Sequence, residues 1–389
     1  MKTERLFDKS SKIKEFEATV LSCEPKGDGK YAVILDKTAF FPNEGGQSCD
    51  GGIIDGVEVL SVDEHDGVIV HTLPSAIAVG ESVPCRLDYM ERFRKMQNHT
   101  AEHIVSGLVH SMFGYENVGF HLGDGYMTAD FDGELSREDI ERIETRANIV
   151  IFSCRRVRAY YPDAEELKAL EYRSKLDLCE NVRIVEIEDT DMCACCAPHV
   201  ENTGEVGLLK IVDAIRYKGG MRLTMVAGLD ALADYRARCE QIRQVSTAIS
   251  AKQSEVADGV LRLLDEVGKL KGRVSALGRE LMQKKLDSLD ATEGSIILFE
   301  DFDDMLSLRN FVNEGVKKCG KFFAVFTPDG DGYKYIIASR SLDLKPLSKK
   351  LNNALSGRGG GSERMIQGSC RADRKSIEQF FDDEPNTWI

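Results

Sequence analysis

The stretch Asn98-His99-Thr100-Ala101-Glu102-His103 carries two histidines that are four residues apart. Asn98 is a favourable N-cap, so we expect a helix that begins at His99. The apolar residues that follow recur at helical spacing; they are Ile104, Val105, Leu108 and Met112. On such a helix His99 and His103 lie one turn apart on the same face, where two imidazoles can bind one divalent metal ion.

A second segment further along the chain, Cys193-Ala194-Cys195-Cys196-Ala197-Pro198-His199, contains a Cys-x-x-x-His pair. The two helical histidines, together with one cysteine and one histidine of this segment, provide the nitrogen and sulfur ligands that tetrahedral zinc prefers. A histidine pair alone is more often structural, but the cysteine segment in the same chain favours a metal site. The predicted zinc ligands are His99, His103, Cys195 and His199. Cys193 and Cys196 are close enough to compete for the sulfur position.

Glu102 allows a different interpretation, because His-x-x-Glu-His is also the inverted zinc-protease motif with the glutamate as base. A protease of that class needs a third ligand and an open coordination position. Cys195 and His199 would fill the coordination shell here, so a metalloprotease is the less favoured alternative.

Length and composition describe a chain of several domains. Its 389 residues exceed a single hydrophobic core, so two to four domains are expected. No run of about 18 apolar residues is present, which argues against a membrane span. The start, Met1-Lys2-Thr3-Glu4-Arg5, lacks the apolar core of a secretion signal. Eleven cysteines, an odd number, then indicate reduced thiols and a cytoplasmic protein.

The net charge of −14 argues against indiscriminate binding of nucleic acid. Local basic patches are still present, and solvated surface charge is the alternative explanation for each of them. The three candidates are Arg92/Arg94/Lys95, Arg155/Arg156/Arg158, and Lys349/Lys350 with Arg358 and Arg364.

Residues 1–90 read as short strands separated by glycine and aspartate, which is typical of a small β-barrel. Within them lies Thr38-Ala39-Phe40-Phe41-Pro42-Asn43-Glu44-Gly45-Gly46-Gln47. The glycine pair permits backbone conformations that other residues resist. This stretch is either a tight turn or a loop that approaches a ligand, with Gln47 as a polar contact.

Residues 91–228 form the predicted zinc-binding domain, an α+β layer. Tyr126–Phe131 is expected to be a strand, and Ser136 is expected to cap a helix that runs to Ile149. His121, in the stretch Val118–Gly123, is a further polar candidate for a pocket. A partly exposed histidine is the alternative there.

Residues 229–290 change to a 3-4 periodicity that predicts a long coiled-coil helix, either folded back on itself or paired with a second chain. Only Ser246 and Gln253 interrupt the apolar register. That register is Leu232, Tyr235, Cys239, Ile242, Ile249, Val256, Val260, Leu263, Val267, Leu270, Val274, Leu277 and Leu281.

Residues 291–389 return to an α/β rhythm, with a glycine-rich stretch at Gly357–Ser362. Such a loop can expose amide groups to a phosphate, and nearby arginines would add charge. The stretch lacks the Lys-Ser/Thr ending of a nucleotide P-loop. The candidate residues for contact with nucleic acid are Arg358, Gly359, Gly360, Gly361 and Arg364.

Together these motifs resemble the freestanding alanyl-tRNA editing proteins of the long type (the AlaX family), and the C-terminal two-thirds of alanyl-tRNA synthetase. Thr38–Gln47 resembles the family's Thr-x-Phe-Tyr-Pro-x-x-Gly-Gly-Gln, with Phe41 in place of tyrosine. The other matches are His99–His103 to His-x-x-x-His, Cys195–His199 to Cys-Gly-Gly-Thr-His, and Gly204–Gly207 to the Gly-x-Ile-Gly that follows. Cys196, Ala197 and Pro198 depart from the family's Gly-Gly-Thr.

The resemblance implies a hydrolase that releases the amino acid from tRNA(Ala) mischarged with serine or glycine, at a zinc site. Glu102 or a ribose hydroxyl would handle the proton, and Thr100, His121 and Gln47 would distinguish serine from alanine. Four protein ligands saturate tetrahedral zinc, so one ligand would be loose, or zinc would orient the substrate. The tail resembles the DHH-associated domain, but without an Asp-His-His motif no phosphodiesterase is expected.

The resemblance also implies that the tail contacts tRNA and that the coiled coil forms a homodimer. Aminoacylation is not expected, because no ATP-binding synthetase core is recognisable in the chain. The open alternatives are a non-catalytic tRNA-binding module with a structural zinc, the metalloprotease, and editing of tRNA(Thr), because threonyl-tRNA synthetase has a similar metal motif.

Overall fold

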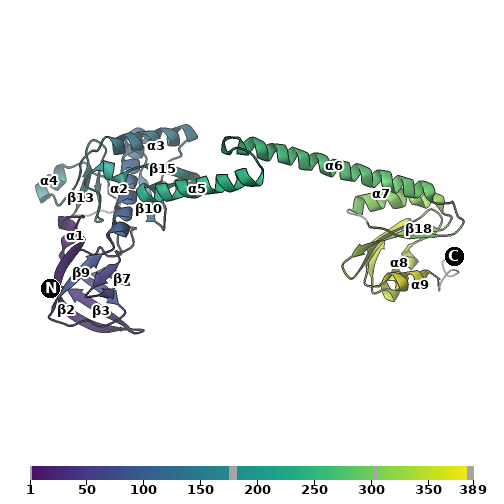
Figure 1. Cartoon of the computed structure of the whole chain (residues 1–389), viewed down its shortest axis with the longest axis horizontal. Helices are drawn as coiled ribbons and strands as arrows, with labels where there is room; N and C mark the ends of the chain where they lie inside the picture. The colour runs from purple at the N-terminus through teal and green to yellow at the C-terminus, as the bar shows by residue number, and fades with distance from the viewer. Residues whose placement is uncertain (1, 175–181, 302–304, 383–389) are drawn as a thin grey trace. The chain divides into compact units, whose positions relative to one another are not determined.

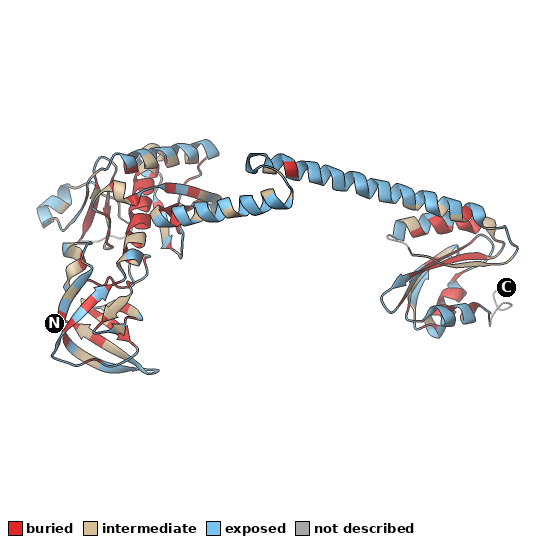
Figure 2. Ribbon diagram, viewed as in Figure 1, coloured by how far each residue is buried: buried red, intermediate tan, exposed pale blue. Residues whose placement is uncertain are grey.

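The structure, a computed structural model, describes residues 2–174, 182–301 and 305–382 (Figure 1). It is a mixed α/β protein with several sheets, as predicted, and divides into two compact units, Met1–Val245 and Ser246–Ile389. Buried residues gather in the sheets and in the helices packed on them, whereas the long helix Val256–Ser288 is mostly exposed (Figure 2). The finer domain boundaries expected near residues 90, 228 and 290 stay predictions. In the described part of the chain, every helix is too short or too polar to cross a bilayer.

The first unit begins with a seven-stranded antiparallel sheet in the order β6-β5-β9-β2-β3-β8-β7. Its strands are β2 (Glu15–Gly27), β3 (Lys30–Leu35), β5 (Gly52–Ile54), β6 (Val57–Glu58), β7 (Ser61–His65), β8 (Val68–Leu73) and β9 (Ser82–Leu87). In β9 buried and exposed residues alternate, as expected for a strand with one face on a core. The short helix α1 (Leu6–Lys9) precedes this sheet, and β1 (Glu4–Arg5) pairs with β4 (Lys37–Thr38) beside it. Closure into a barrel stays a prediction.

Helix α2 (Tyr89–Phe113) is the central helix of the first unit. It begins ten residues before the predicted start, because the Asp88 side chain caps it by accepting a hydrogen bond from the Glu91 amide. It ends at Gly114, whose φ of 71° suits glycine. The predicted N-cap at Asn98 is therefore wrong. Asn98 lies inside the helix and is buried, and its side chain bonds Asp230 at 2.7 Å and the Ala227 amide at 3.0 Å.

Two sheets and helix α3 pack around α2. The four-stranded sheet has the order β10-β11-β16-β15, and the three-stranded sheet has the order β12-β13-β14. Their strands are β10 (Asn117–Leu122), β11 (Met127–Phe131), β12 (Val157–Tyr160), β13 (Ile184–Ile187), β14 (Asp191–Ala194), β15 (Leu209–Tyr217) and β16 (Gly220–Ala227). Ser136 and Asp139 form a capping box at the start of α3 (Arg137–Phe152), which confirms Ser136 as N-cap. A short helix, α4 (Ala164–Ala169), and a 3₁₀ turn, η1 (Thr203–Val206), complete this part.

The region predicted as one long coiled-coil helix contains two helices, α5 (Gly228–Ala248) and α6 (Val256–Ser288). The break includes Ser250, which has a positive φ of 52°, and the 3₁₀ turn η2 (Gln253–Glu255). The break lies between Ser246 and Gln253, the two polar residues that interrupt the apolar register. The Ser246 hydroxyl donates to the Ala251 carbonyl, a local side-chain hydrogen bond that competes with continued helix. Leu263, Leu270 and Leu277 on α6 are 48%, 53% and 55% exposed. The coiled coil stays a prediction.

The second unit also contains a five-stranded sheet in the order β17-β18-β19-β21-β20. Its elements are β17 (Ile296–Phe299), α7 (Met305–Gly315), η3 (Val316–Lys318), β18 (Phe322–Asp329), β19 (Gly332–Ser339), α8 (Lys345–Ala354), β20 (Arg358–Gly361), β21 (Met365–Cys370) and α9 (Arg374–Asp382). Buried residues of α7 and the end of α6 share one core with the sheet, and buried residues of α8 and α9 share the other.

The glycine-rich stretch is an edge strand, β20, and the predicted loop is wrong. Glycine is required there for close approach, because a Cβ at position 359 would lie 2.2 Å from the Tyr335 hydroxyl. Gly361, with a φ of 156°, then leads into the turn before β21.

Candidate metal centre and adjoining pocket

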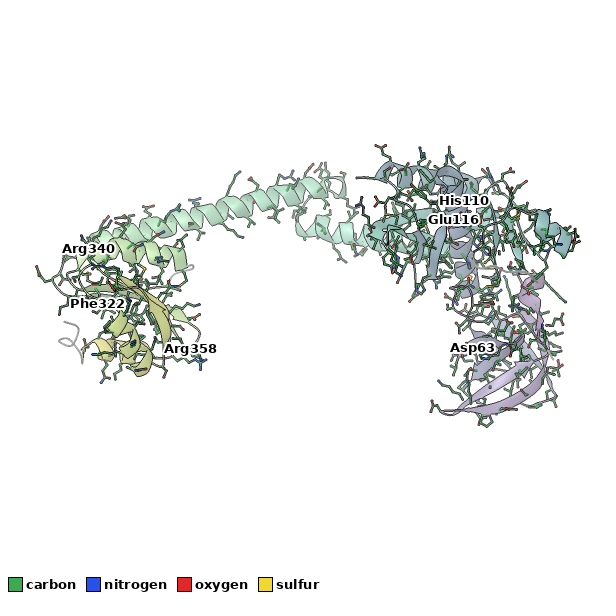
Figure 3. The ribbon with its side chains drawn as sticks, turned by 180° about the vertical axis from the view of Figure 1, so that it is seen from behind. Asp63, His110, Glu116, Phe322, Arg340 and Arg358 are labelled. Carbon is green, nitrogen blue, oxygen red and sulfur yellow. The ribbon has the colours of Figure 1, made fainter. Side chains whose placement is uncertain are left out.

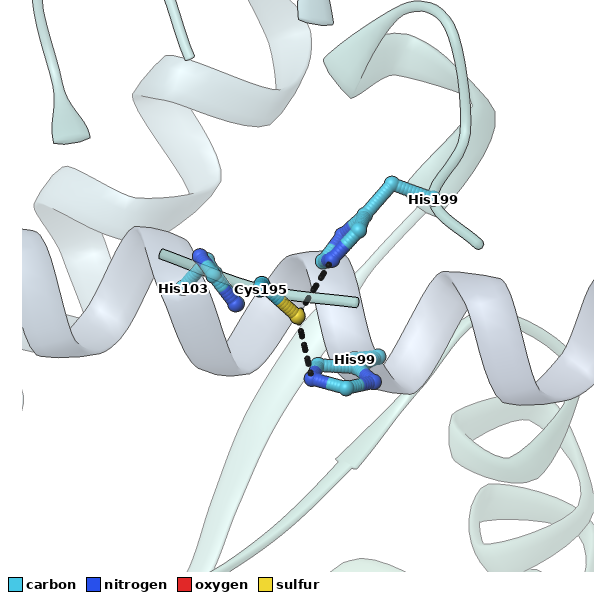
Figure 4. Close-up of side chains that lie close together, drawn as sticks. All are labelled: His99, His103, Cys195 and His199. Carbon is cyan, nitrogen blue, oxygen red and sulfur yellow. Dashed lines mark hydrogen bonds between the residues drawn. The ribbon is translucent and has the colours of Figure 1, made fainter. Parts of the chain in front are cut away.

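The four predicted metal ligands meet in the first unit. His99 and His103 project from α2, while Cys195 and His199 follow β14, and their donor atoms all lie within 4.8 Å of one another (Figure 4). The Cys195 sulfur is 3.6 Å from His99 Nε2 and 3.4 Å from His199 Nε2. Zinc bonds nitrogen at about 2.0–2.1 Å and sulfur at about 2.3 Å, so donors this close can share one ion. Of the three candidate cysteines, Cys195 belongs to this cluster.

Two of the four groups in the cluster, Cys195 and His199, are held in the charge state that binds a metal. Burial would lower the pKa of His103, but its hydrogen bonds to Asp191 and Cys195 raise that pKa well above its ordinary value. Burial by itself would raise the pKa of the Cys195 thiol, but the imidazoles of His99, His103 and His199 outweigh it and hold this pKa well below its ordinary value. Burial lowers the pKa of His199 to about 3, which keeps that imidazole neutral. A thiolate and a neutral imidazole are the forms that bind metals. Burial instead raises the pKa of Cys193, to about 11, and that of Cys196.

Each histidine of the cluster is oriented by a hydrogen bond at Nδ1. His99 Nδ1 is 3.0 Å from Gln47 Oε1, and His199 Nδ1 is 3.0 Å from Thr100 Oγ1. His103 Nδ1 is 3.2 Å from Asp191 Oδ2. Such partners fix the ring and leave Nε2 for the metal. Thr100 and Gln47, predicted to contact the substrate, thus contact histidines, and neither lines the pocket described below.

Asp191 and its partner Arg173 were not found by sequence reasoning. The Arg173 guanidinium donates to both carboxylate oxygens of Asp191, at 2.8 and 2.9 Å. Burial would raise the pKa of Asp191, but His103 and Arg173 lower it below its ordinary value. An acid four residues before Cys195, in an otherwise apolar strand, was the available signal.

A loop of the N-terminal sheet is held against α2 by buried polar contacts. Arg92 Nε donates to Asp50 Oδ1 at 2.9 Å, and its Nη2 donates to the Ala39 carbonyl at 2.7 Å. One turn further along α2, Lys95 donates to the Cys49 carbonyl at 2.6 Å. Arg92 and Lys95 are only 1% and 4% exposed, so this predicted basic patch is not a surface for nucleic acid. The contacts of Arg92 and Lys95 hold the loop in the position where Gln47 reaches His99.

A cavity of about 440 Å³ adjoins the cluster. Its wall includes His99, His103 and Cys195, together with Glu102, Asn117 and Phe120. His121 is exposed and does not line this cavity, so its predicted place in the pocket is wrong. The register of β10 shifts between Asn117 and Gly119, and Phe120 lies against His99 with ring centroids 4.7 Å apart. Because successive side chains of a strand point to opposite faces, His121 points away from the cavity when Phe120 faces His99.

The remaining predicted site residues lie in the second unit. Arg358 and Gly359–Gly361 form the exposed edge strand β20, and Arg364 follows in the turn before β21. The Arg364 guanidinium donates to the Arg340 carbonyl. Arg340 and Arg358 occupy different parts of this unit (Figure 3).

Known proteins resemble this chain over nearly its whole length. The family model "Threonyl and Alanyl tRNA synthetase second additional domain" matches residues 182–263, which include Cys195 and His199. The alanyl-tRNA editing protein AlaX-L of Pyrococcus horikoshii is 27% identical over 402 residues, covering 97% of this chain and 96% of that protein. The predicted resemblance to that editing protein is thus confirmed.

The chain also resembles larger proteins and a small solved domain. The alanine–tRNA ligase of Ignicoccus hospitalis is 29% identical over 393 residues, which is 97% of this chain but 42% of the ligase. The chain therefore spans about two fifths of the length of such ligases. The C-Ala domain of Aquifex aeolicus alanyl-tRNA synthetase is 16% identical and covers 25% of this chain and 97% of that domain. Its TM-score of 0.22 is too low to bear on the fold.

Proposed function

We propose that this protein is an editing hydrolase that deacylates tRNA(Ala) carrying serine or glycine. The observation that carries the proposal is the buried His99–His103–Cys195–His199 cluster beside a cavity of about 440 Å³. A cavity of this size accepts a small aminoacyl group and part of the terminal ribose. Similarity to AlaX-L along 97% of the chain supports this substrate class.

Zinc is the proposed metal of the cluster. Three imidazole nitrogens and one thiolate form a donor set that zinc favours. When bound, zinc would orient the substrate, or, with one of the four ligands loose, it would supply Lewis acidity for the ester carbonyl. Gln47, Thr100 and Asp191 hold the three histidine rings in place, and Phe120 packs against His99. Glu102 also lines the cavity.

The second unit is proposed to contact the tRNA. Arg309, Arg340 and Arg364 line one concavity of about 530 Å³, and Arg358 is exposed on β20. Arginine groups of this kind bind phosphates. The exposed leucines of α6 are proposed to pair with a second copy of the chain, which would bury them. Action on charged tRNA is consistent with a cytoplasmic protein.

Two other functions are less well supported. A non-catalytic tRNA-binding module with a structural zinc would use the same four ligands. Such a module would keep its metal but would not deacylate tRNA, which distinguishes it from the editing hydrolase. A metalloprotease would need an open coordination position, whereas Cys195 and His199 stand beside both α2 histidines.

The decisive experiment measures deacylation of Ser-, Gly- and Ala-tRNA(Ala) by the native protein and by His103→Ala, with metal content determined for both. Rapid loss of Ser- or Gly-tRNA(Ala) that spares Ala-tRNA(Ala), and that His103→Ala abolishes, is the expected result. Failure on all three substrates with metal still bound would support the binding module instead.

A further inference from the structure

Glu102 and Asn117, which line the cavity, form a buried hydrogen-bond network with Ser106. The Ser106 hydroxyl donates to Glu102 Oε1 at 2.5 Å, and the Asn117 amide donates to the same oxygen. The Asn117 amide also donates to Ser106 Oγ, at 2.9 Å. Glu102, Ser106 and Asn117 are 4%, 1% and 7% exposed. Two donors thus hold one oxygen of a buried carboxylate.

Asn117 is itself fixed in place. Its Oδ1 accepts a hydrogen bond from the Gly119 amide at 3.0 Å, where the register of β10 shifts. An amide nitrogen has two hydrogens, and the Asn117 nitrogen directs its bonds to Glu102 and Ser106. The Glu102 carboxylate therefore has a defined orientation against β10, which a surface glutamate would not have.

The second oxygen of Glu102 remains available to a ligand. Among the residues that the structure describes, Glu102 Oε2 has no hydrogen-bond partner, and Glu102 lines the cavity together with His99, His103 and Cys195. A carboxylate oxygen can only accept hydrogen bonds. The cavity thus presents an oriented acceptor beside the metal cluster, matched to a hydroxyl or an amine of the substrate.

We propose that Glu102 Oε2 accepts a hydrogen bond from the β-hydroxyl of the seryl group, which makes Glu102 the specificity-determining residue of the deacylase; this rests on the proposed function. Alanine would leave this oxygen unpaired, which such sites reject strongly. Glycine lacks the β-carbon and leaves room for a water molecule to donate instead. Ser106 and Asn117 are positioning residues for this carboxylate.

The test separates recognition of the hydroxyl from catalysis by varying substrate and protein together. tRNA(Ala) is acylated with serine, glycine, alanine or 2-aminobutyrate, in which a methyl group replaces the seryl hydroxyl. The native protein is expected to favour Ser-tRNA over the 2-aminobutyryl substrate by about 100-fold or more in kcat/KM. Equal rates on these two substrates would overturn the proposal while leaving the deacylase function intact.

The variant Glu102→Met keeps the length of the side chain and removes the acceptor. The serine preference over 2-aminobutyrate is expected to fall at least about 10-fold, with glycyl-tRNA hydrolysis changed only a few-fold. Glu102→Gln must turn its oxygen to Ser106 and Asn117, so it presents a donor to the cavity and should give a smaller loss of preference. Ser106→Ala keeps the carboxylate and removes one of its two donors, so it should lower the serine preference less than Glu102→Met does.

Other outcomes have distinct meanings. A uniform loss on serine, glycine and 2-aminobutyrate in Glu102→Met and Glu102→Gln, with metal content unchanged, would make Glu102 a general base or an amine-binding group and overturn the proposal. No hydrolysis of any substrate by the native protein would instead contradict the proposed function. If Glu102→Met does not fold, Glu102→Gln and the substrate comparison on the native protein still decide the question.

Discussion

The region around α2 and the C-terminal sheet bury very different residues. Along α2 the buried set includes Arg92, Lys95, Asn98, His99 and Glu102. In the described part of the C-terminal unit the buried polar residues are uncharged, namely Thr327, Ser339 and Ser348. The polar groups of α2 are held by partners such as Asp50, Gln47 and Asp191. Burying polar groups costs free energy unless they are paired. A helix that carries so many of them is organised for chemistry, and the sheet for stability.

The largest expected effect is loss of the metal centre itself. Replacing His103 by alanine removes one of four donors and also leaves Asp191 without its imidazole partner. Loss of a ligand should exceed the 10–100-fold typical of an outer partner, so we expect deacylation to fall by more than about 100-fold. Metal content and Ser-tRNA(Ala) hydrolysis measure it. His121→Ala is the matched control and should leave both unchanged, since His121 is exposed.

Two ion pairs sharpen the comparison between the regions. Asp50 and Arg92 have side chains that are 1% and 0% exposed, whereas Asp329 and Lys334 of the C-terminal unit are 44% and 46% exposed. Asp50→Ala leaves the buried Arg92 guanidinium without its counter-charge and should cost about 3–5 kcal/mol. Asp329→Ala should cost less than about 1 kcal/mol. Urea unfolding followed by circular dichroism gives both values, and similar costs would contradict the distinction.

Asp191→Asn tests the partner of His103. The metal affinity should fall about 10–100-fold, because the carboxylate orients the imidazole. His103 and Arg173 outweigh burial and lower the pKa of Asp191, so its carboxylate stabilises the native state above a pH of about 4. That contribution is lost as the pH falls through the lowered pKa. The native protein should therefore lose more stability than the variant below pH 4 in acid titration; parallel curves would argue against this role.

The smallest effect is expected on the C-terminal surface. Arg364→Ala should weaken binding of tRNA(Ala) that carries no amino acid only a few-fold. It should also reduce the slope of log affinity against log salt concentration by about 1. Arg374→Ala is the control, because Arg374 is paired with Glu378 at 2.7 Å. Filter binding at several salt concentrations measures both, and an unchanged slope for Arg364→Ala would remove this residue from the tRNA surface.

Spacing along the chain was sufficient to predict the four metal donors. A four-residue step on a helix brings two histidines to one face, and a Cys-x-x-x-His step is equally local, so neither depends on the rest of the fold. The N-cap of α2 was missed because the polar side chain of Asn98 bonds Asp230 and Ala227, residues distant in the sequence. The pocket residue at β10 was misassigned because a register shift decides which of Phe120 and His121 faces inward.

The sequence by itself determined the mixed α/β character, the donor set and the resemblance to an alanyl-tRNA editing protein, because periodicity and motif spacing are properties of local segments. Only the tertiary structure decided which polar groups face the cavity. Thr100 and Gln47 orient histidines, and Glu102 lines the cavity with its hydrogen-bond partner Asn117. These roles depend on packing between segments far apart in the chain, where burial favours the pairing of polar groups.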